Sequence, residues 1–290
     1  MQCHFMQRTK SVNGEYKFYP CGHCAVCRKN DALEWGLRSY LEAKSYEQSV
    51  FVTLTYDDEH LLQSKMLVYS GMLSPSHIKD FCKSFSYYNQ APFRYFIGGE
   101  YGENTNRAHY HAILFGVNIT SPAFYDKFWV QSKSGYNSYC KAWPYGFTLL
   151  QPLTPQRCFY AAKYATKYTK DVIDEMKLFG QQPPFRRMSK GLGREWFEKN
   201  REELLIRGYL NYKGCKMRIP RYYFDRLFPS DSPEKEAYYL NRKAFFKSYA
   251  DKDLKLYENF VGKGKQYGSL YYLHNALGEQ FEENVKKGKI

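Results

Sequence analysis

The sequence predicts an α+β fold in which helices pack on a central antiparallel β-sheet. Segments rich in β-branched and aromatic residues alternate with segments whose apolar residues recur at helical spacing. Two of the expected strands are joined by a short polar loop, which is typical of an antiparallel hairpin. From residue 49 to residue 173 the expected order is strand, helix, two strands, an unassigned stretch, strand and helix. This order suits helices layered on one sheet.

The first expected elements are a helix, a strand and a second helix. Apolar residues recur at roughly helical spacing over about residues 25–46, which predicts an amphipathic helix. Residues 49–58, SVFVTLTYDD, are β-branched and aromatic and end in acidic residues, so we expect a strand. Ser74 and Pro75 then suit the cap and the first position of another helix.

A hairpin, a strand and a helix follow. Residues 93–100 and 109–117 are expected strands separated by the polar loop YGENTNRA. Residues 146–153, GFTLLQPL, predict a further strand. We expect a helix over about residues 154–173, with Thr154 as its cap.

The chain is expected to have three regions. Residues 1–46 form a cysteine-rich extension and a helix, residues 47–175 the α+β core, and residues 176–290 a basic, aromatic C-terminal region. No stretch approaches the roughly 20 apolar residues of a membrane helix. The N-terminus, MQCHFMQRTK, lacks the apolar segment of a secretory signal. We therefore expect a cytoplasmic protein without a membrane partner.

The composition favours a nucleic-acid partner. The net charge is +14, and aromatic residues make up 19% of the chain, with 29 Tyr and 21 Phe. Lysine and arginine neutralise phosphates, and flat rings stack on unpaired bases. Single-stranded nucleic acid is the partner that both features suit. The alternative is a basic soluble protein with a tyrosine-rich surface.

Two histidines and a glutamate are a candidate metal site. His109 and His111 point to the same face of a strand because side chains alternate. If the hairpin loop closes symmetrically, Glu100 lies opposite His109 on that face. Such a nitrogen and oxygen site suits Mg²⁺ or Mn²⁺ with a phosphate oxygen. Glu103 in the loop is the competing carboxylate, and the alternative is that the histidines are merely packed or exposed.

A tyrosine stripe in the last expected helix is a candidate set of nucleophiles. Tyr160, Tyr164 and Tyr168 are spaced by four, and Lys163 and Lys167 complete a tandem Tyr-x-x-Lys. A nearby ammonium favours the phenolate and stabilises charge on a phosphate under attack. The small alanines between the tyrosines are expected to leave room for a nucleic-acid strand. The alternative is a half-buried packing face.

The cysteines near the N-terminus are spaced as metal ligands, because thiolates three residues apart can wrap a tetrahedral Zn²⁺. The candidate ligands of this structural zinc are Cys3, Cys21, Cys24 and Cys27, with His4 and His23 as alternatives for the fourth position. An iron–sulfur cluster or free thiols are the other interpretations. The remaining cysteines are expected to be buried thiols: Cys82, Cys140, Cys158 and Cys215.

The motifs taken in order resemble those of the HUH endonucleases. These are FVTLTYDD, GGEYG, HYH and the helix with the tandem Tyr-x-x-Lys. HUH denotes two histidines around a bulky apolar residue, and Tyr110 is a less common choice for the middle position. The chain is most similar to the replication initiators of microviruses, small single-stranded DNA bacteriophages, and especially to their gokushovirus branch. PCGHCAVCR and IPRYY strengthen the likeness, which covers about residues 1–225.

The resemblance implies a rolling-circle mechanism. Tyr160 or Tyr164 would attack the origin on one strand, leaving a 5′-phosphotyrosine and a free 3′-OH, and the second tyrosine would cut after one round. By position, His109 and His111 match the metal ligands of the family, and the two motif lysines match as well. The implied partners are single-stranded and origin DNA, and host replication proteins such as a helicase, in the host cytoplasm.

Two other functions are compatible with the sequence. A non-catalytic, zinc-containing protein that binds single-stranded nucleic acid would explain the charge, the aromatic content and the cysteines. Another HUH enzyme, such as a relaxase, plasmid initiator or transposase, would explain the motifs. The doubled Tyr-x-x-Lys argues against plasmid initiators and transposases that use one tyrosine.

Overall fold

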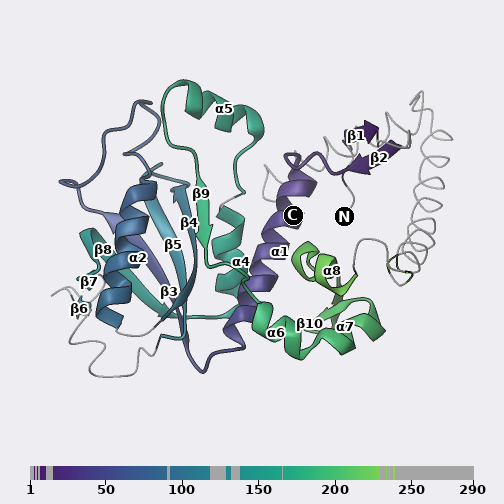
Figure 1. Cartoon of the computed structure of the whole chain (residues 1–290). Helices are drawn as coiled ribbons and strands as arrows, with labels where there is room; N and C mark the ends of the chain where they lie inside the picture. Colours follow the sequence, from purple (N-terminus) through teal and green to yellow (C-terminus); the bar gives the residue numbers. More distant parts are fainter. Residues whose placement is uncertain are drawn as a thin grey trace. The chain divides into compact units, whose positions relative to one another are not determined.

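The computed structural model consists of two compact units, residues 31–199 and residues 1–30 with 200–290 (Figure 1). The structure describes residues 3, 5, 7–10, 16–89, 92–117, 129–131, 138–164, 166–228, 233, 235 and 238. Each unit is considered by itself below.

The unit of residues 31–199 is built on one antiparallel sheet of seven described strands. In sheet order they are β6 (Trp129–Gln131), β7 (Ser138–Cys140), β8 (Trp143–Pro152), β3 (Ser49–Tyr56), β5 (Ala108–Phe115), β4 (Arg94–Tyr101) and β9 (Phe185–Met188). The predicted α+β class, with helices on an antiparallel sheet, is confirmed.

The described helices of this unit begin close to the predicted signals. They are α1 (Ala25–Ala43), which starts in the other unit, α2 (Pro75–Asn89), α4 (Pro155–Tyr164), α5 (Lys170–Leu178) and α6 (Arg194–Lys199). The Ser74 hydroxyl accepts a hydrogen bond from the His77 backbone N–H at 3.3 Å. Thr154 does the same for the backbone N–H of Arg157 at 3.3 Å. Both predicted caps are therefore present.

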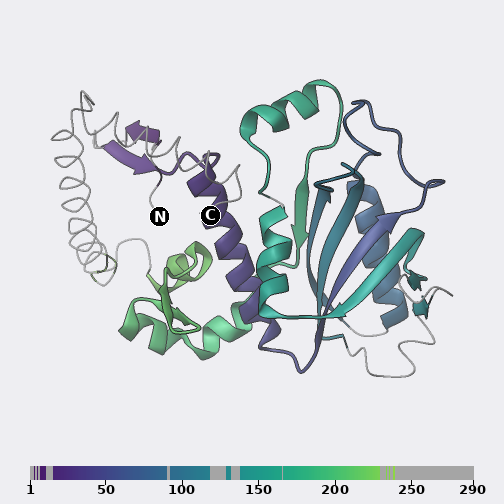
Figure 2. The same ribbon diagram turned by 180° about the vertical axis from the view of Figure 1, so that it is seen from behind.

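Helices cover both faces of the sheet, as Figures 1 and 2 show. On one face the buried Phe81 and Phe85 of α2 belong to the same apolar cluster as Leu54 of β3. On the other face, α4 packs through Ala161 against a cluster that includes Ile113 of β5. Because strand residues alternate between faces, β5 directs its even-numbered residues to α2 and its odd-numbered residues to α4.

The predicted helix over about residues 154–173 is interrupted, which corrects the sequence-based expectation. Helix α4 ends at Tyr164, and α5 begins at Lys170. Thr166 donates both its backbone N–H and its hydroxyl to the carbonyl of Lys163, at 3.1 and 3.0 Å. Side-chain bonds of this kind compete with the helical pattern. Tyr168 consequently leaves the stripe and packs against the apolar cluster under α2.

The alanines of α4 have a structural role rather than the expected one of admitting nucleic acid. Ala161 and Ala162 are buried at 0% and 1% exposure against the sheet. Small residues also bring α1 close to α4, since a Cβ on Gly36 would lie 2.9 Å from the Cα of Phe159. The small side chains thus set how closely α4 approaches its neighbours.

The second unit contains two small antiparallel hairpins and short helices. Its described elements are β1 (Gln7–Lys10), β2 (Tyr16–Tyr19), the start of α1, α7 (Arg201–Arg207), β10 (Leu210–Tyr212), β11 (Cys215–Met217) and α8 (Arg221–Leu227). Its buried apolar side chains include Leu204, Leu210, Ile219, Tyr223 and Leu227.

The compact units do not follow the three regions expected from the sequence, whose division remains a prediction. Strand β9 lies beyond residue 175 yet pairs with β4 of the sheet. No described helix is both long and apolar enough to span a membrane. Among the isolated cysteines, Cys140 and Cys158 are buried and Cys82 is partly buried, but Cys215 is exposed, which corrects the expectation of a buried thiol there.

Candidate metal and tyrosine site

The hairpin of β4 and β5 brings the three predicted ligands together. Glu100 pairs directly with His109, so the predicted register is confirmed. His111 lies two residues further along β5, on the same face. Glu100 and His111 are only 2% and 5% exposed. The site therefore lies on the α4 face of the sheet and is largely shielded from water.

The imidazoles converge on one carboxylate oxygen. The Nε2 atoms of His109 and His111 each lie 3.0 Å from Oε1 of Glu100. Nδ1 of His109 lies 2.9 Å from the carbonyl oxygen of Arg107, which can only accept, so this nitrogen donates. In a neutral His109, Nε2 then presents a lone pair to the carboxylate. Such an arrangement requires a cation, either a proton or a metal ion, between the two groups.

A divalent metal fits this donor set. The other carboxylate oxygen of Glu100, Oε2, is buried and has no hydrogen-bond partner among the described residues. The candidate ligand atoms of the three residues all lie within 4.8 Å of one another. Neighbouring ligands of an octahedral ion such as Mg²⁺, each about 2.1 Å from it, are about 3 Å apart. The 3.0 Å separations match that spacing.

Electrostatics favour the protonation states that bind a metal. Burial alone would raise the pKa of Glu100, but hydrogen bonds with His109 and His111 hold its pKa below the ordinary value. Burial lowers the pKa of His111. An ionised carboxylate beside a neutral imidazole is the combination that a cation needs.

The competing carboxylate, Glu103, lies outside this group of ligands. Its side chain is 61% exposed, and its Oε1 lies 3.7 Å from Nζ of Lys167. The carboxylate that groups with the two histidines is that of Glu100. Glu100 therefore suits the third ligand position better than Glu103.

Two of the predicted tyrosines face the histidines from α4. The rings of Tyr160 and Tyr164 lie 5.0 and 5.4 Å from the ring of His111, between centroids. The two tyrosine rings are 4.5 Å apart. They differ in access, because Tyr160 is 43% exposed and Tyr164 is 8% exposed. Burial raises the pKa of Tyr164, and its contact with Tyr160 adds to the rise.

The motif lysines flank Tyr164. Nζ of Lys163 and Nζ of Lys167 each lie 6.0 Å from the centroid of the Tyr164 ring. Lys167 also lies 5.6 Å from the ring of Tyr168. Two cations beside the tyrosines are suitably placed to meet a phosphate, because lysine acts as a point charge on phosphate oxygens.

Two supporting groups were not predicted from the sequence. The hydroxyl of Thr53 on β3 lies 3.2 Å from Nδ1 of His111, and the backbone carbonyl of Arg107 holds His109. Such contacts fix the ring orientation of metal-binding histidines. Thr53 pairs directly with His111 in the sheet. Only the pairing of β3 with β5 reveals this, and it joins residues far apart in the chain.

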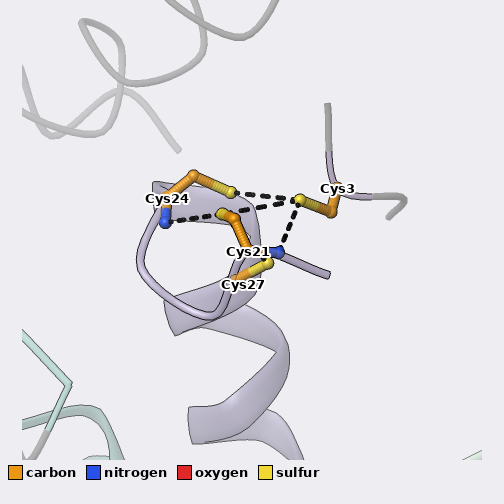
Figure 3. A group of neighbouring side chains, drawn as sticks. All are labelled: Cys3, Cys21, Cys24 and Cys27. Carbon is orange, nitrogen blue, oxygen red and sulfur yellow. Dashed lines mark hydrogen bonds between the residues drawn. The ribbon is translucent and has the colours of Figure 1, made fainter. Parts of the chain in front are cut away.

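The second unit holds the cysteine cluster, in which four sulfur atoms point toward one another (Figure 3). Sγ of Cys3 lies 3.5 Å from that of Cys21 and 3.9 Å from that of Cys24. Sγ of Cys21 and Sγ of Cys27 are 3.8 Å apart. Sulfur ligands about 2.3 Å from a tetrahedral zinc ion are about 3.8 Å apart. The geometry therefore fits four cysteine ligands.

The alternative histidine ligands are not part of the cluster as described. Nδ1 of His23 lies 2.8 Å from the carbonyl oxygen of Cys21, and His4 is outside the described residues. Burial would raise the pKa of Cys21, but backbone and side-chain hydrogen bonds lower it to about 7. Burial raises the pKa of Cys24 to about 11. Ionising all four thiols together requires a cation, which a structural metal would supply.

Comparison with known proteins identifies the class to which this fold and site belong. The family model of the replication-associated protein ORF2 matches residues 49–169. The match begins at β3 and ends just before α5, so it contains the histidines, the glutamate and both tyrosines of α4. No solved structure matches the chain significantly.

Curated phage proteins narrow the class. The chain is 31% identical over 226 residues to the replication-associated protein VP4 of Bdellovibrio phage phiMH2K, covering 75% of this chain and 69% of that protein. It is 33% identical over 225 residues to the replication-associated protein ORF2 of Spiroplasma virus 4, covering 71% and 66%. It is 25% identical over 237 residues to the replication-associated protein ORF4 of Chlamydia phage 1, covering 77% and 57%.

The chain therefore belongs to the family of phage replication-associated proteins. This confirms the resemblance to the replication initiators of microviruses that the motifs indicated.

Proposed function

We propose that this protein initiates rolling-circle replication by nicking and rejoining one DNA strand through a covalent 5′-phosphotyrosine. The observation that carries the proposal is the placement of Tyr160 and Tyr164 against His111, with Glu100 and His109 beside it. Nucleophile and metal ligands thus meet on one face of one sheet. The family membership supports the same function, since the relatives are replication-associated proteins.

In the proposed reaction a phenol oxygen exchanges one phosphodiester for another. The phenol loses its proton, its oxygen bonds to the phosphorus, and the bond from phosphorus to the 3′ oxygen breaks. The departing 3′ oxygen takes a proton and becomes the 3′-OH that primes synthesis. Because one ester replaces another, the energy of the bond is retained for rejoining, and no nucleotide cofactor is needed.

The residues of the chain have distinct roles in this scheme. Glu100, His109 and His111 would hold Mg²⁺ or Mn²⁺, which when bound polarises the phosphate under attack. Lys163 and Lys167 would bind phosphate oxygens and balance the charge that develops on them. Tyr160 would cut first, because its ring is 43% exposed whereas that of Tyr164 is 8% exposed. Tyr164 would act once the first tyrosine carries DNA.

The four cysteines are proposed to hold a structural zinc ion in the other unit. Apolar residues that pack with them are few, since only Val26 joins three of the cysteines in their described buried cluster. A metal would therefore supply much of the free energy that orders this segment. In the host cell, single-stranded and origin DNA are the proposed substrates, and a host helicase is a proposed partner.

A covalent adduct assay tests the function. The protein is incubated with single-stranded DNA of the genome that encodes it and with Mn²⁺, then denatured and resolved on a gel. The wild-type chain should give a protein–DNA adduct, and Tyr160→Phe combined with Tyr164→Phe should abolish it. Tyr168→Phe is the matched control and should leave the adduct intact, because Tyr168 packs on the other side of the sheet.

A metal-site variant completes the test. His109→Ala combined with His111→Ala should remove the adduct and the dependence on Mn²⁺ together. An adduct that persists in the double tyrosine variant would contradict the choice of nucleophiles. Cleavage that persists in the double histidine variant would contradict the metal site.

A further inference from the structure

The hairpin of β10 and β11 is a narrow basic ribbon that the proposed nicking reaction does not use. The strands pair antiparallel, with Leu210 opposite Met217 and Tyr212 opposite Cys215. Lys213 and Gly214 form the turn and both have positive φ, 49° and 81°. Two such residues are typical of a type I′ turn, which joins strands tightly. Figure 1 shows β10 beside α7, within the same unit.

Only the base of the hairpin is anchored in apolar surroundings. Leu210 at its start and Ile219 just after its end are each 2% exposed. Asn211 and Lys216, which pair on one face, are exposed, and so is Cys215 on the other face. The outer part of the ribbon therefore has solvent on both faces. A two-stranded ribbon contributes little stability of its own, so burial does not explain this one.

Positive charge is concentrated on the hairpin. Residues 209–218, YLNYKGCKMR, contain four basic side chains and no acidic one. Nζ of Lys216 lies 4.6 Å from the ring centroid of Tyr209, and Nζ of Lys213 lies 5.8 Å from that of Tyr212. The ammonium groups are thus held over the ring faces that a nucleic-acid base would need for stacking. This arrangement favours contact with phosphates over stacking of unpaired bases.

We propose that the β10–β11 hairpin binds duplex DNA by entering a groove, with Lys213 and Lys216 contacting backbone phosphates. Paired strands are about 4.8 Å apart, and the major groove is about 12 Å wide, so a two-stranded ribbon with its side chains fits. The proposal rests on the proposed function in taking DNA as the partner. It adds a second DNA contact, one that reads duplex rather than the single strand to be cut.

Binding by the full-length chain tests the proposal. The affinity for a fluorescent duplex of random sequence, and for one of its single strands, is measured by anisotropy over a series of salt concentrations. The test variant is Lys213→Asn with Lys216→Gln, because Asn-Gly is a favoured type I′ turn and preserves the fold of the hairpin. The matched control is Lys177→Gln with Lys199→Gln, which removes the same charge from two lysines in local ion pairs.

The hairpin variant should bind duplex on the order of tenfold more weakly at about 0.1 M salt. The slope of log affinity against log salt should fall by about 1.8, since each phosphate contact contributes about 0.9. Lys213→Arg with Lys216→Arg should restore both values, and the control should change neither appreciably. The adduct with a short single-stranded oligonucleotide should form at the wild-type rate in the hairpin variant.

Several results would overturn the proposal. They are the absence of duplex binding by the wild type, an unchanged salt slope in the hairpin variant, an equal loss in the control, and a loss for the single strand as large as that for the duplex. These outcomes are independent of nicking. If the wild-type chain formed no adduct, the proposed function would fail, and the duplex-binding result would still decide the role of the hairpin.

Discussion

Replacing Thr53 by valine should weaken the metal site while leaving the fold intact. The change keeps the shape of the side chain and removes the hydroxyl that lies 3.2 Å from Nδ1 of His111. Because His111 is 5% exposed, water cannot easily replace the lost partner. A neutral hydrogen bond contributes about 1 kcal/mol, roughly fivefold in affinity, and such supporting contacts typically contribute 10–100-fold to metal binding. We therefore expect Mn²⁺ to bind on the order of tenfold more weakly.

Calorimetric titration of Mn²⁺ measures this loss directly, and adduct formation at increasing Mn²⁺ supplies a second readout. Saturating Mn²⁺ should restore the adduct in Thr53→Val, because the variant still contains the three proposed ligands. Thr55→Val is the matched control on the same strand and face, and no described hydrogen bond of its hydroxyl is at stake; its affinity should stay within about twofold. Wild-type Mn²⁺ affinity in Thr53→Val would refute the orienting role, and a loss of adduct that Mn²⁺ cannot restore would show that Thr53 acts otherwise.

Three further changes test the packing around the site and the cysteine cluster. Gly36→Ala should destabilise the chain by about 1–3 kcal/mol in chemical denaturation, because its Cβ would lie 2.9 Å from the Cα of Phe159, and wild-type stability would contradict the close approach of α1 and α4. Glu42→Gln should cost about 2 kcal/mol in the same measurement, because the buried carboxylate accepts the backbone N–H of Gly193, and a change below about 0.5 kcal/mol would argue against that bond. Cys27→Ser should reduce bound zinc in elemental analysis to well below one ion per chain, and an unchanged zinc content would exclude this ligand.

The parts of the site that depend on nearby residues could be predicted from the sequence. The register that places Glu100 opposite His109 follows from a short hairpin loop, which leaves few ways to pair the strands. The pairing of Tyr160 with Tyr164 follows from helical spacing of four. The three cysteines within one short turn could likewise be grouped from their spacing alone.

The parts that depend on distant residues could not be predicted in this way. Thr53 supports His111 only because β3 pairs with β5, and β9 joins the sheet from beyond the expected core. The break after Tyr164 was also missed, because helical periodicity continues through Tyr168 while Thr166 turns the backbone by bonding to a carbonyl. In each case a tertiary contact or a local side-chain bond overrides the pattern.

The central claim is that the tyrosines beside Glu100, His109 and His111 become covalently linked to DNA, and peptide mapping of the adduct tests it most directly. Trypsin cleaves after Arg157, Lys163, Lys167 and Lys170, so each tyrosine of the repeat falls in its own peptide: CFYAAK, YATK and YTK. After nuclease trimming, mass spectrometry should find a nucleotide on CFYAAK early in the reaction, and on YATK when Tyr160 is replaced by phenylalanine. A nucleotide on YTK, or on a peptide outside this segment, would contradict the account.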